Sequence, residues 1–316
     1  AIDPAGGSWY VENLTREVAN TAWNLFQEVE SKGGILESIK NNFIQDEINK
    51  VAEKRKANLA IRKDKIVGTN MYPNMSEKPL ETIDRDQKKM FEKRAQYLND
   101  FRTSGELEKH VQPLKKLSEV LEAKPDDIFE KMIEAAYNSA TIGEIKSTVR
   151  LDDTVSGQVT PLRIHRGAEI FEQLRDNMKA YIKKTGKAPR VFLANMGPVK
   201  QHKARADFSS GFFQVGGFEI INNAGFDSSD AAAEAALDSG SQIVVICSTD
   251  PTYPELVPPL VEKIKKEDTE IVIVLAGYPK DQIEQHKSSG VDEFIHIRAN
   301  VHEILEKLQK KLGVLA

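Results

Sequence analysis

The C-terminal part of the sequence predicts an α/β fold built on a doubly wound parallel sheet. From residue 191 onward, five short apolar runs recur, and a stretch with helical spacing of apolar residues follows each of them. Strands that alternate with helices in this way form parallel sheets with helices on both faces. The lengths of the repeats and the turn residues between them agree with this interpretation.

Each repeat can be placed along the chain. The expected strands cover residues 191–194, 218–221, 242–246, 270–275 and 293–297. The expected helices lie near residues 206–215, 230–239, 254–266, 281–289 and 301–312. A set of this size indicates a flavodoxin-like, doubly wound five-stranded sheet with strand order 2-1-3-4-5.

Composition sets the frame. The chain has 316 residues, of which 40% are hydrophobic and 29% charged, as expected for a globular protein with more than one domain. A net charge of -4 argues against general nucleic-acid binding, and no run of about 18 apolar residues predicts a membrane span. A lone Cys247, no zinc-like His/Cys pattern and no signal peptide indicate a cytoplasmic protein without a metal site.

Residues 1–188 are predicted to be mostly helical. Helices are expected at residues 14–29, 35–60, 84–101 and 162–184, with two or three more between residues 102 and 147 and a short strand at 65–68. The stretch 125–127, Pro-Asp-Asp, is a helix start signal. Three further stretches have the character of motifs: DPAGGSWY at 3–10, VGTNMY at 67–72 and ATIGEI at 140–145.

In these three stretches the chain resembles methylmalonyl-CoA mutases, whose matching motifs read D-P-x-G-G-S-Y, V-G-V-N-x-Y and x-x-T-x-G-E-I. The resemblance implies three parts: the C-terminal end of a (β/α)8 barrel at residues 1–78, a helical linker at 79–188, and a cobalamin-binding-type domain at 189–316. The family's acyl-CoA and radical-steering residues lie mostly in earlier barrel strands. We therefore expect the chain to be a part of a longer polypeptide, either cleaved or incomplete.

The family's cobalamin loop follows the first strand and reads M-G-x-D-x-H-x-x-G, where the His binds cobalt. Aligned on Met196-Gly197, this chain has Val199, Gln201 and Ala204 in place of Asp, His and Gly. His202 lies one residue late, with neither a carboxylate to orient it nor a Gly for close approach of the corrin. We expect His202 to be an exposed loop imidazole, with a role as cobalt ligand as the alternative.

Two more elements of the family's cofactor site are altered. The S-x-L segment after the third strand is Ser248-Thr249-Asp250 here, and an anionic Asp250 is badly placed against an apolar benzimidazole. The Gly-Gly after the fourth strand is Ala276-Gly277, and the ring of Tyr278 is expected to fill the slot of the nucleotide tail.

These losses favour one function within the family. The resemblance implies a non-catalytic small subunit that holds no cofactor or metal itself and forms a heterodimer with a large subunit, which carries adenosylcobalamin and isomerises methylmalonyl-CoA to succinyl-CoA. Two alternatives stay open: a divergent cobalamin-binding acyl-CoA mutase active in its own right, and a flavodoxin-like module that binds another ligand.

Two remaining features are interpreted as structural. Cys247, at the end of a strand, is expected to be a buried apolar residue rather than a nucleophile. Lys200, Lys203 and Arg205 are expected to form a solvated basic loop, with a carboxylate or phosphate site as the alternative.

Overall fold

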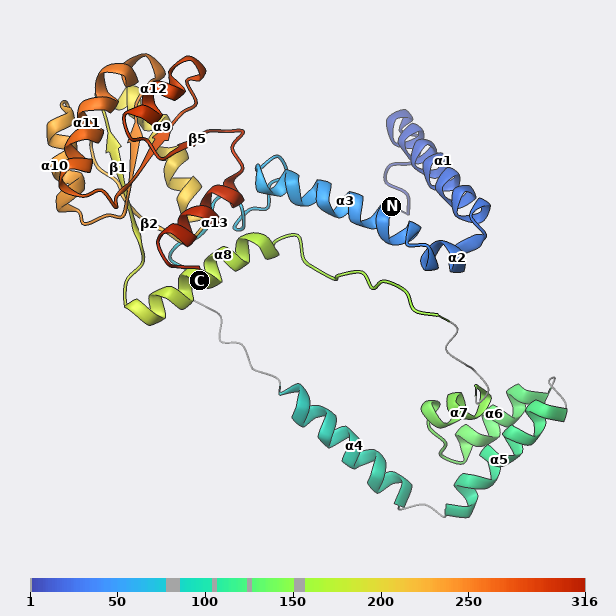
Figure 1. Ribbon diagram of the computed structural model, residues 1–316. Coiled ribbons are helices and arrows are strands. Elements are labelled where there is room, and N and C mark those ends of the chain that lie inside the picture. The colour runs from blue at the N-terminus through green and yellow to red at the C-terminus, as the bar shows by residue number, and fades with distance from the viewer. Residues whose placement is uncertain (1, 78–85, 104–106, 124–126, 151–156, 316) are drawn as a thin grey trace. The chain divides into compact units, whose positions relative to one another are not determined.

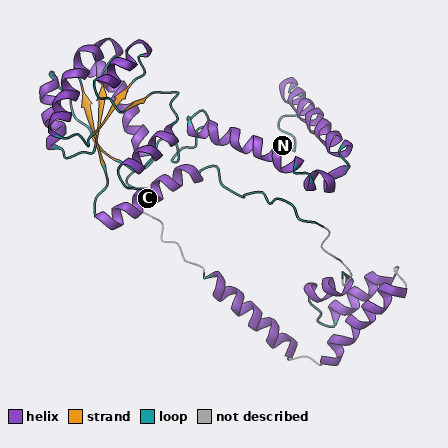
Figure 2. Ribbon diagram, in the orientation of Figure 1, coloured by secondary structure: helices purple, strands orange, loops and turns teal. Residues whose placement is uncertain are grey.

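The computed structural model describes residues 2–77, 86–103, 107–123, 127–150 and 157–315. The chain divides into two compact units: Ala1–Glu77 with Val159–Ala316, and Lys78–Gln158. Figure 1 shows the elements in chain order, and Figure 2 separates helices from strands. The three domain boundaries expected from the sequence stay predictions.

The expected sheet is confirmed. Within the described residues it has five strands in the order β2-β1-β3-β4-β5, and every neighbouring pair is parallel. Figure 2 shows these strands side by side with helices around them. The strands are β1 (Arg190–Asn195), β2 (Glu219–Ile221), β3 (Ile243–Cys247), β4 (Val272–Ala276) and β5 (Glu293–Ile295).

Helices cover both faces of the sheet, as the alternation of the sequence predicts. Buried side chains of α8 (Glu169–Thr185), α9 (Val199–Gln214) and α13 (Val301–Lys311) form one layer of the core. Side chains of α10 (Ser229–Asp238), α11 (Tyr253–Glu267) and α12 (Ile283–Ser288) pack on the other face. Two short 3₁₀ turns, η2 (Asp250–Thr252) and η3 (Lys280–Gln282), precede α11 and α12.

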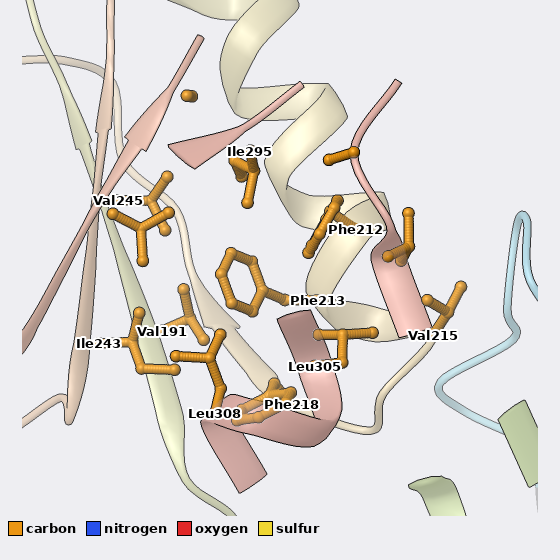
Figure 3. Close-up of a cluster of buried hydrophobic side chains, with 14 of the residues drawn as sticks. Val191, Phe212, Phe213, Val215, Phe218, Ile243, Val245, Ile295, Leu305 and Leu308 are labelled. Atoms are coloured by element: carbon orange, nitrogen blue, oxygen red, sulfur yellow. The ribbon is translucent and has the colours of Figure 1, made fainter. Parts of the chain in front are cut away.

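Phe213 of α9 lies at the centre of the first layer. Figure 3 shows its ring between strand residues Val191 and Val245 on one side and Leu305 of α13 on the other. Its exposed fraction is 0%, and its ring meets Phe218 edge-on with 5.7 Å between centroids. Phe213 therefore fixes how α9 lies on the sheet.

Helix α8 starts later than expected, at Glu169 rather than near residue 162. Acidic Glu169 and Glu172 lie in its first turn and basic Lys183 and Lys184 in its last, which suits the helix dipole. The stretch 163–166 before it is rich in basic residues and has no acidic residue, so it lacks those start signals.

The N-terminal segment is helical, but two expectations for it are wrong. The single helix expected at 35–60 is two helices, because Asn42 adopts a left-handed conformation (φ 61°) between them. The strand expected at 65–68 reduces to one isolated bridge between Val67 and Met71, because no neighbouring strand is present in the described residues to extend it. The helices are α1 (Trp9–Ser31), α2 (Gly34–Lys40) and α3 (Phe43–Ala60).

The segment after α3 docks on the sheet-containing part of its unit. Arg62 Nη2 donates to the carbonyl of Gly211 in α9 at 2.7 Å, and its guanidinium lies 5.4 Å from the ring centroid of Phe212. Burial lowers the pKa of Arg62 to about 10. A second hydrogen bond joins this segment to α8, because Arg175 donates to the carbonyl of Gly68 at 2.8 Å.

Every regular element in the described residues of the second unit is a helix. Leu117, Ala135 and Ile145, from three helices, form its small core. Thr141 and Glu144 form a reciprocal capping box that starts the last of these helices. Residue 84, where a helix was expected to begin, and the start signal at 125–126 lie outside the described residues. The helices are α4 (Gln87–Thr103), α5 (Leu107–Ala123), α6 (Ile128–Tyr137) and α7 (Ile142–Val149).

Replacing Phe213 with Ala should reduce the free energy of unfolding of the sheet-containing unit by roughly 3–5 kcal/mol, because a fully buried ring leaves a cavity. The measurement is a urea titration followed by far-ultraviolet circular dichroism. Phe26→Ala, at a site that is 51% exposed, is the control and should cost under about 1 kcal/mol. Equal costs for the two variants would contradict the central position of Phe213.

Candidate functional site

The candidate site lies at the carboxyl ends of β1, β3 and β4, where doubly wound sheets bind ligands. The expected polar loop after β1 is not there. Helix α9 begins at Val199, so only Met196, Gly197 and Pro198 separate it from the strand. The three altered loop positions, Val199, Gln201 and Ala204, all lie in the first two turns of this helix.

His202 is not the exposed loop imidazole that the sequence predicts. It lies within α9, its exposed fraction is 4%, and its Nδ1 donates to the carbonyl of Gly197 at 2.9 Å. The turn at Gly225 packs closely against the imidazole, because a Cβ on Gly225 would come within 2.7 Å of His202 Cε1. The imidazole thus ties the start of α9 to the turn that follows β1.

Arg205 lies one helical turn further along α9 and crosses the ends of two strands. Its Nη1 donates to the carbonyl of Ala276, the last residue of β4, at 2.7 Å. Its Nη2 donates to Asp250 Oδ1, just beyond β3, at 2.9 Å. The side chains of Arg205 and Asp250 are 32% and 45% exposed, so the pair adds little to stability, and its main effect is to fill space.

Tyr253 closes the deeper part of the same region. Its hydroxyl lies 2.7 Å from the Ala276 carbonyl and accepts from the backbone N–H of Ser248 at 3.1 Å. Burial raises the pKa of Tyr253, so the hydroxyl stays protonated. Ser248 is itself fully buried and its Oγ lies 2.8 Å from Thr252 Oγ1.

The turn at Gly277 shows how tightly this region is packed. A Cβ on Gly277 would lie 2.7 Å from Arg205 Nη1, 3.0 Å from Asp250 Oδ1 and 3.3 Å from the Tyr253 ring. Real Cβ contacts are almost never that short, so the position tolerates no side chain unless its neighbours move. Arg205, Asp250 and Tyr253, which we call the strand-end cluster, therefore occupy the space around Gly277.

Tyr278 does not fill this space, contrary to expectation. Its ring is 46% exposed and lies 4.7 Å from the His296 ring and 6.0 Å from the Phe294 ring, centroid to centroid. Both of those residues belong to β5 or the turn after it. The backbone leaving Gly277 carries Tyr278 toward β5 at the edge of the sheet, whereas Arg205 lies against Gly277 itself.

One polar atom at the strand ends lacks a partner. Asn195, the last residue of β1, is 1% exposed, and its Nδ2 donates to Asn222 Oδ1 at 2.8 Å. Its Oδ1 is buried without a hydrogen-bond partner. A single acceptor suits a water-sized donor and does not provide the ligand set of a large cofactor.

Cys247 is buried, as expected. Its exposed fraction is 0%, and burial raises the pKa of its thiol to about 12. Its Sγ lies 3.7 Å from Ser209 Oγ of α9. A neutral, enclosed thiol is a poor nucleophile, so the structure supports a packing role.

Among the described residues, no three His, Cys, Asp or Glu side chains gather in a way that could hold a metal ion. Within the same ranges, no helix is long and apolar enough to cross a membrane. Of the expected basic residues, Lys203 pairs with Asp207 on the surface of α9, whereas Arg205 belongs to the strand-end cluster.

The pairing of Arg205 with Asp250 was missed at the sequence level. A signal was present: Asp250 follows the third strand, Arg205 lies in the segment that follows the first, and these strands are neighbours in the order 2-1-3-4-5. The assumption of a loop after the first strand hid it, because a loop gives no fixed direction to Arg205.

Gly277→Ala should reduce the free energy of unfolding by roughly 1–3 kcal/mol, because the new methyl group displaces Arg205 from the Ala276 carbonyl. Gly211→Ala is the matched control, since a Cβ there meets nothing within 4 Å. In an Arg205→Ala background the cost of Gly277→Ala should shrink. An unchanged cost in that background, measured by urea unfolding, would show that the strand-end cluster does not fill the space.

The thiol of Cys247 should not react with Ellman's reagent at pH 8 in the folded protein, because its raised pKa leaves almost no thiolate. In 8 M urea, one equivalent per chain should react, since Cys247 is the only cysteine. Ser288→Cys, which adds a thiol at an exposed position, should give one fast equivalent in the folded state. Fast reaction of the unaltered chain without denaturant would contradict the burial.

Comparisons with known proteins show which family this chain is similar to. Residues 1–154 match the family described as "Methylmalonyl-CoA mutase". The chain is 28% identical to the methylmalonyl-CoA mutase small subunit of Porphyromonas gingivalis, over 99% of this chain and 40% of that protein. It is 26% identical to the small subunit of Streptomyces virginiae, over 99% of this chain and 38% of that one.

A large subunit is also similar, though over less of the chain. The methylmalonyl-CoA mutase large subunit of Porphyromonas gingivalis is 25% identical, over 87% of this chain and 39% of its own length. A solved cobalamin-binding protein from Desulfitobacterium hafniense covers 65% of this chain at 15% identity, with a TM-score of 0.33. The chain thus spans about 40% of the length of the curated relatives that it matches.

The sequence motifs, the family match and the small-subunit relatives all lead to the same group of proteins. The resemblance of this chain to methylmalonyl-CoA mutases, and among them to the small subunits, is therefore confirmed.

Proposed function

We propose that this chain is part of a non-catalytic small subunit of an adenosylcobalamin-dependent methylmalonyl-CoA mutase. The observation that carries the proposal is the strand-end cluster of Arg205, Asp250 and Tyr253. It occupies with protein side chains the place where doubly wound sheets bind ligands. The small-subunit relatives support the same assignment.

Cobalamin does not fit the residues of this chain. Gln201 stands at the position of the cobalt ligand, and α9 winds the expected loop into a helix directly after β1. His202 is only 4% exposed, and a Cβ on Gly225 would come within 2.7 Å of its Cε1, so the imidazole is too enclosed to reach a corrin. We infer that adenosylcobalamin belongs to the partner chain and that catalytic residues are absent from this one.

The proposed partner is a large subunit, which isomerises methylmalonyl-CoA to succinyl-CoA, in a cytoplasmic heterodimer. The exposed apolar side chains of α1 support association with further protein, since contiguous exposed apolar surface marks interaction sites. Trp9, Leu14, Val18 and Trp23 are 87%, 47%, 61% and 59% exposed. The proposed parts of the chain are the barrel end at 1–78, the linker at 79–188 and the cobalamin-type domain at 189–316.

Hydroxocobalamin added to the purified chain at tens of micromolar should not remain with the protein after gel filtration, and the visible spectrum of the cobalamin should not change. The reason is that the strand-end cluster leaves no room for the nucleotide tail. His202→Ala should give the same null result. Retained cobalamin with a histidine-ligated spectrum that disappears in His202→Ala would overturn the proposal.

A cobalamin-bearing methylmalonyl-CoA mutase large subunit from the same source serves as the positive control. It should retain cobalamin in the same assay and should co-elute with the chain when the two are mixed. Failure to co-elute would remove the proposed partner, while the null cobalamin result would still stand.

A further inference from the structure

A surface groove of about 470 Å³ lies beside β5. Its lining comes from the turn after β4, from α12, from β5 with the turn that follows it, and from α13. Pockets for small organic molecules typically have volumes of roughly 300–1,000 Å³, so the groove has a suitable size. None of Arg205, Asp250 and Tyr253 lines it, so the groove lies outside the strand-end cluster.

Aromatic and aliphatic side chains form one part of this groove. The ring centroids of Tyr278 and His296 lie 4.7 Å apart, and the Phe294 ring meets Tyr278 edge-on at 6.0 Å. Tyr278 is 46% exposed, so much of it remains accessible to a ligand. Ile283 and Ile304 add apolar surface. A flat aromatic ring gains both apolar burial and ring stacking on such a surface.

The charged side chains of the groove differ in whether they already have partners. Both carboxylates that line it are engaged: Glu293 pairs with Lys307 at 2.7 Å, and Glu303 accepts from Asn300 Nδ2 at 3.0 Å. The guanidinium of Arg298 is exposed and has no ion pair or hydrogen bond within the described part of the chain. A guanidinium binds phosphate or carboxylate through two parallel N–H bonds, so Arg298 has its donors free for an anionic ligand.

His296 lies between the aromatic part of the groove and Arg298. Its Nδ1 accepts from the backbone N–H of Arg298 at 3.2 Å, so the proton of the neutral imidazole is on Nε2. Burial and the nearby Arg298 charge lower the pKa of His296, so the ring is neutral at pH 7. Nε2 has no hydrogen-bond partner among the residues that the structure describes, which leaves one more donor for a ligand.

We propose that this groove binds a small aromatic anion, in which one flat ring carries one phosphate or carboxylate group. The ring lies against Tyr278 and His296, and the acidic group accepts from the guanidinium of Arg298. The two parts of the ligand are close together, because Arg298 follows His296 by two residues. Both contacts are needed, since neither a stacked ring nor a single exposed ion pair overcomes the cost of binding by itself.

The test follows the His296 ring signal by NMR in the purified chain with ¹³C-labelled histidines. The chain has six histidines, and the signal that disappears in His296→Gln belongs to His296. Phenyl phosphate and benzoate should each shift this signal with a Kd on the order of a millimolar, as expected of ligands of this size. Inorganic phosphate lacks the ring and benzyl alcohol lacks the charge, so each should bind at least about tenfold more weakly. The tighter of the two aromatic anions identifies the preferred acidic group, and either result supports the proposal.

Variants separate the two contacts. Arg298→Ala should weaken phenyl phosphate binding at least about tenfold, and Arg298→Lys should lie between this variant and the unaltered chain, because it keeps the charge without the paired donors. Tyr278→Ala should weaken binding of both aromatic anions. Arg55→Ala removes an exposed positive charge on α3, outside the groove, and should leave both affinities unchanged.

The pKa of His296 gives a second measurement at the same place. Bound phenyl phosphate should raise it, because an anion beside the ring favours the imidazolium form. Without ligand, Arg298→Ala should raise it as well, because a nearby positive charge is lost. Equal affinity of Arg298→Ala and the unaltered chain for phenyl phosphate would overturn the proposal. So would inorganic phosphate or benzyl alcohol that binds as tightly as the aromatic anions.

Discussion

Much of this fold depends on how α9 is held at the ends of the strands. Two of its side chains bond backbone carbonyls there: His202 bonds Gly197 after β1, and Arg205 bonds Ala276 at the end of β4. These bonds satisfy carbonyls at the strand ends and start the helix immediately after the first strand. Because α9 begins so early, only Met196, Gly197 and Pro198 separate it from β1.

The core and the strand-end cluster support each other. Phe213, three turns along the helix from His202, is packed between β1, β3 and α13, and sets the height of α9 above the sheet. Arg62, from the segment after α3, reaches the same helix through the Gly211 carbonyl. The position of α9 is thus tied both to the sheet and to the N-terminal part of the unit.

The sequence was sufficient for the elements whose periodicity is strong. The five strands, their order and the burial of Cys247 follow from apolar runs and β/α alternation, and all three are confirmed. Prediction from the sequence failed where one backbone conformation or one long-range contact determines the local structure. The left-handed Asn42 breaks an otherwise continuous helical pattern, and His202 is buried through a wall supplied by the turn at Gly225.

The candidate site itself was only half predictable. The departures from the family's loop motif can be observed directly at Val199, Gln201 and Ala204, because a motif has fixed spacing. The strand-end cluster cannot be derived from spacing, since Asp250 and Tyr253 lie 45 and 48 residues from Arg205 and approach it only in the folded sheet. Tyr278 was the expected filler because it adjoins Gly277 in sequence, yet the strand direction carries its ring to β5.

Under the proposed function, loss of the ligand residues and filling of the space are physically one change. An emptied cofactor crevice would leave a cavity, and cavities cost roughly 24 cal/mol per Å³ in lost packing. Wound as a helix, the loop brings Arg205 over the strand ends, and Asp250 satisfies its charge where the family has an apolar residue. Under the proposed function, replacing Gln201 with His alone does not rebuild a cobalamin site, because the space is held by the strand-end cluster and not by residue 201.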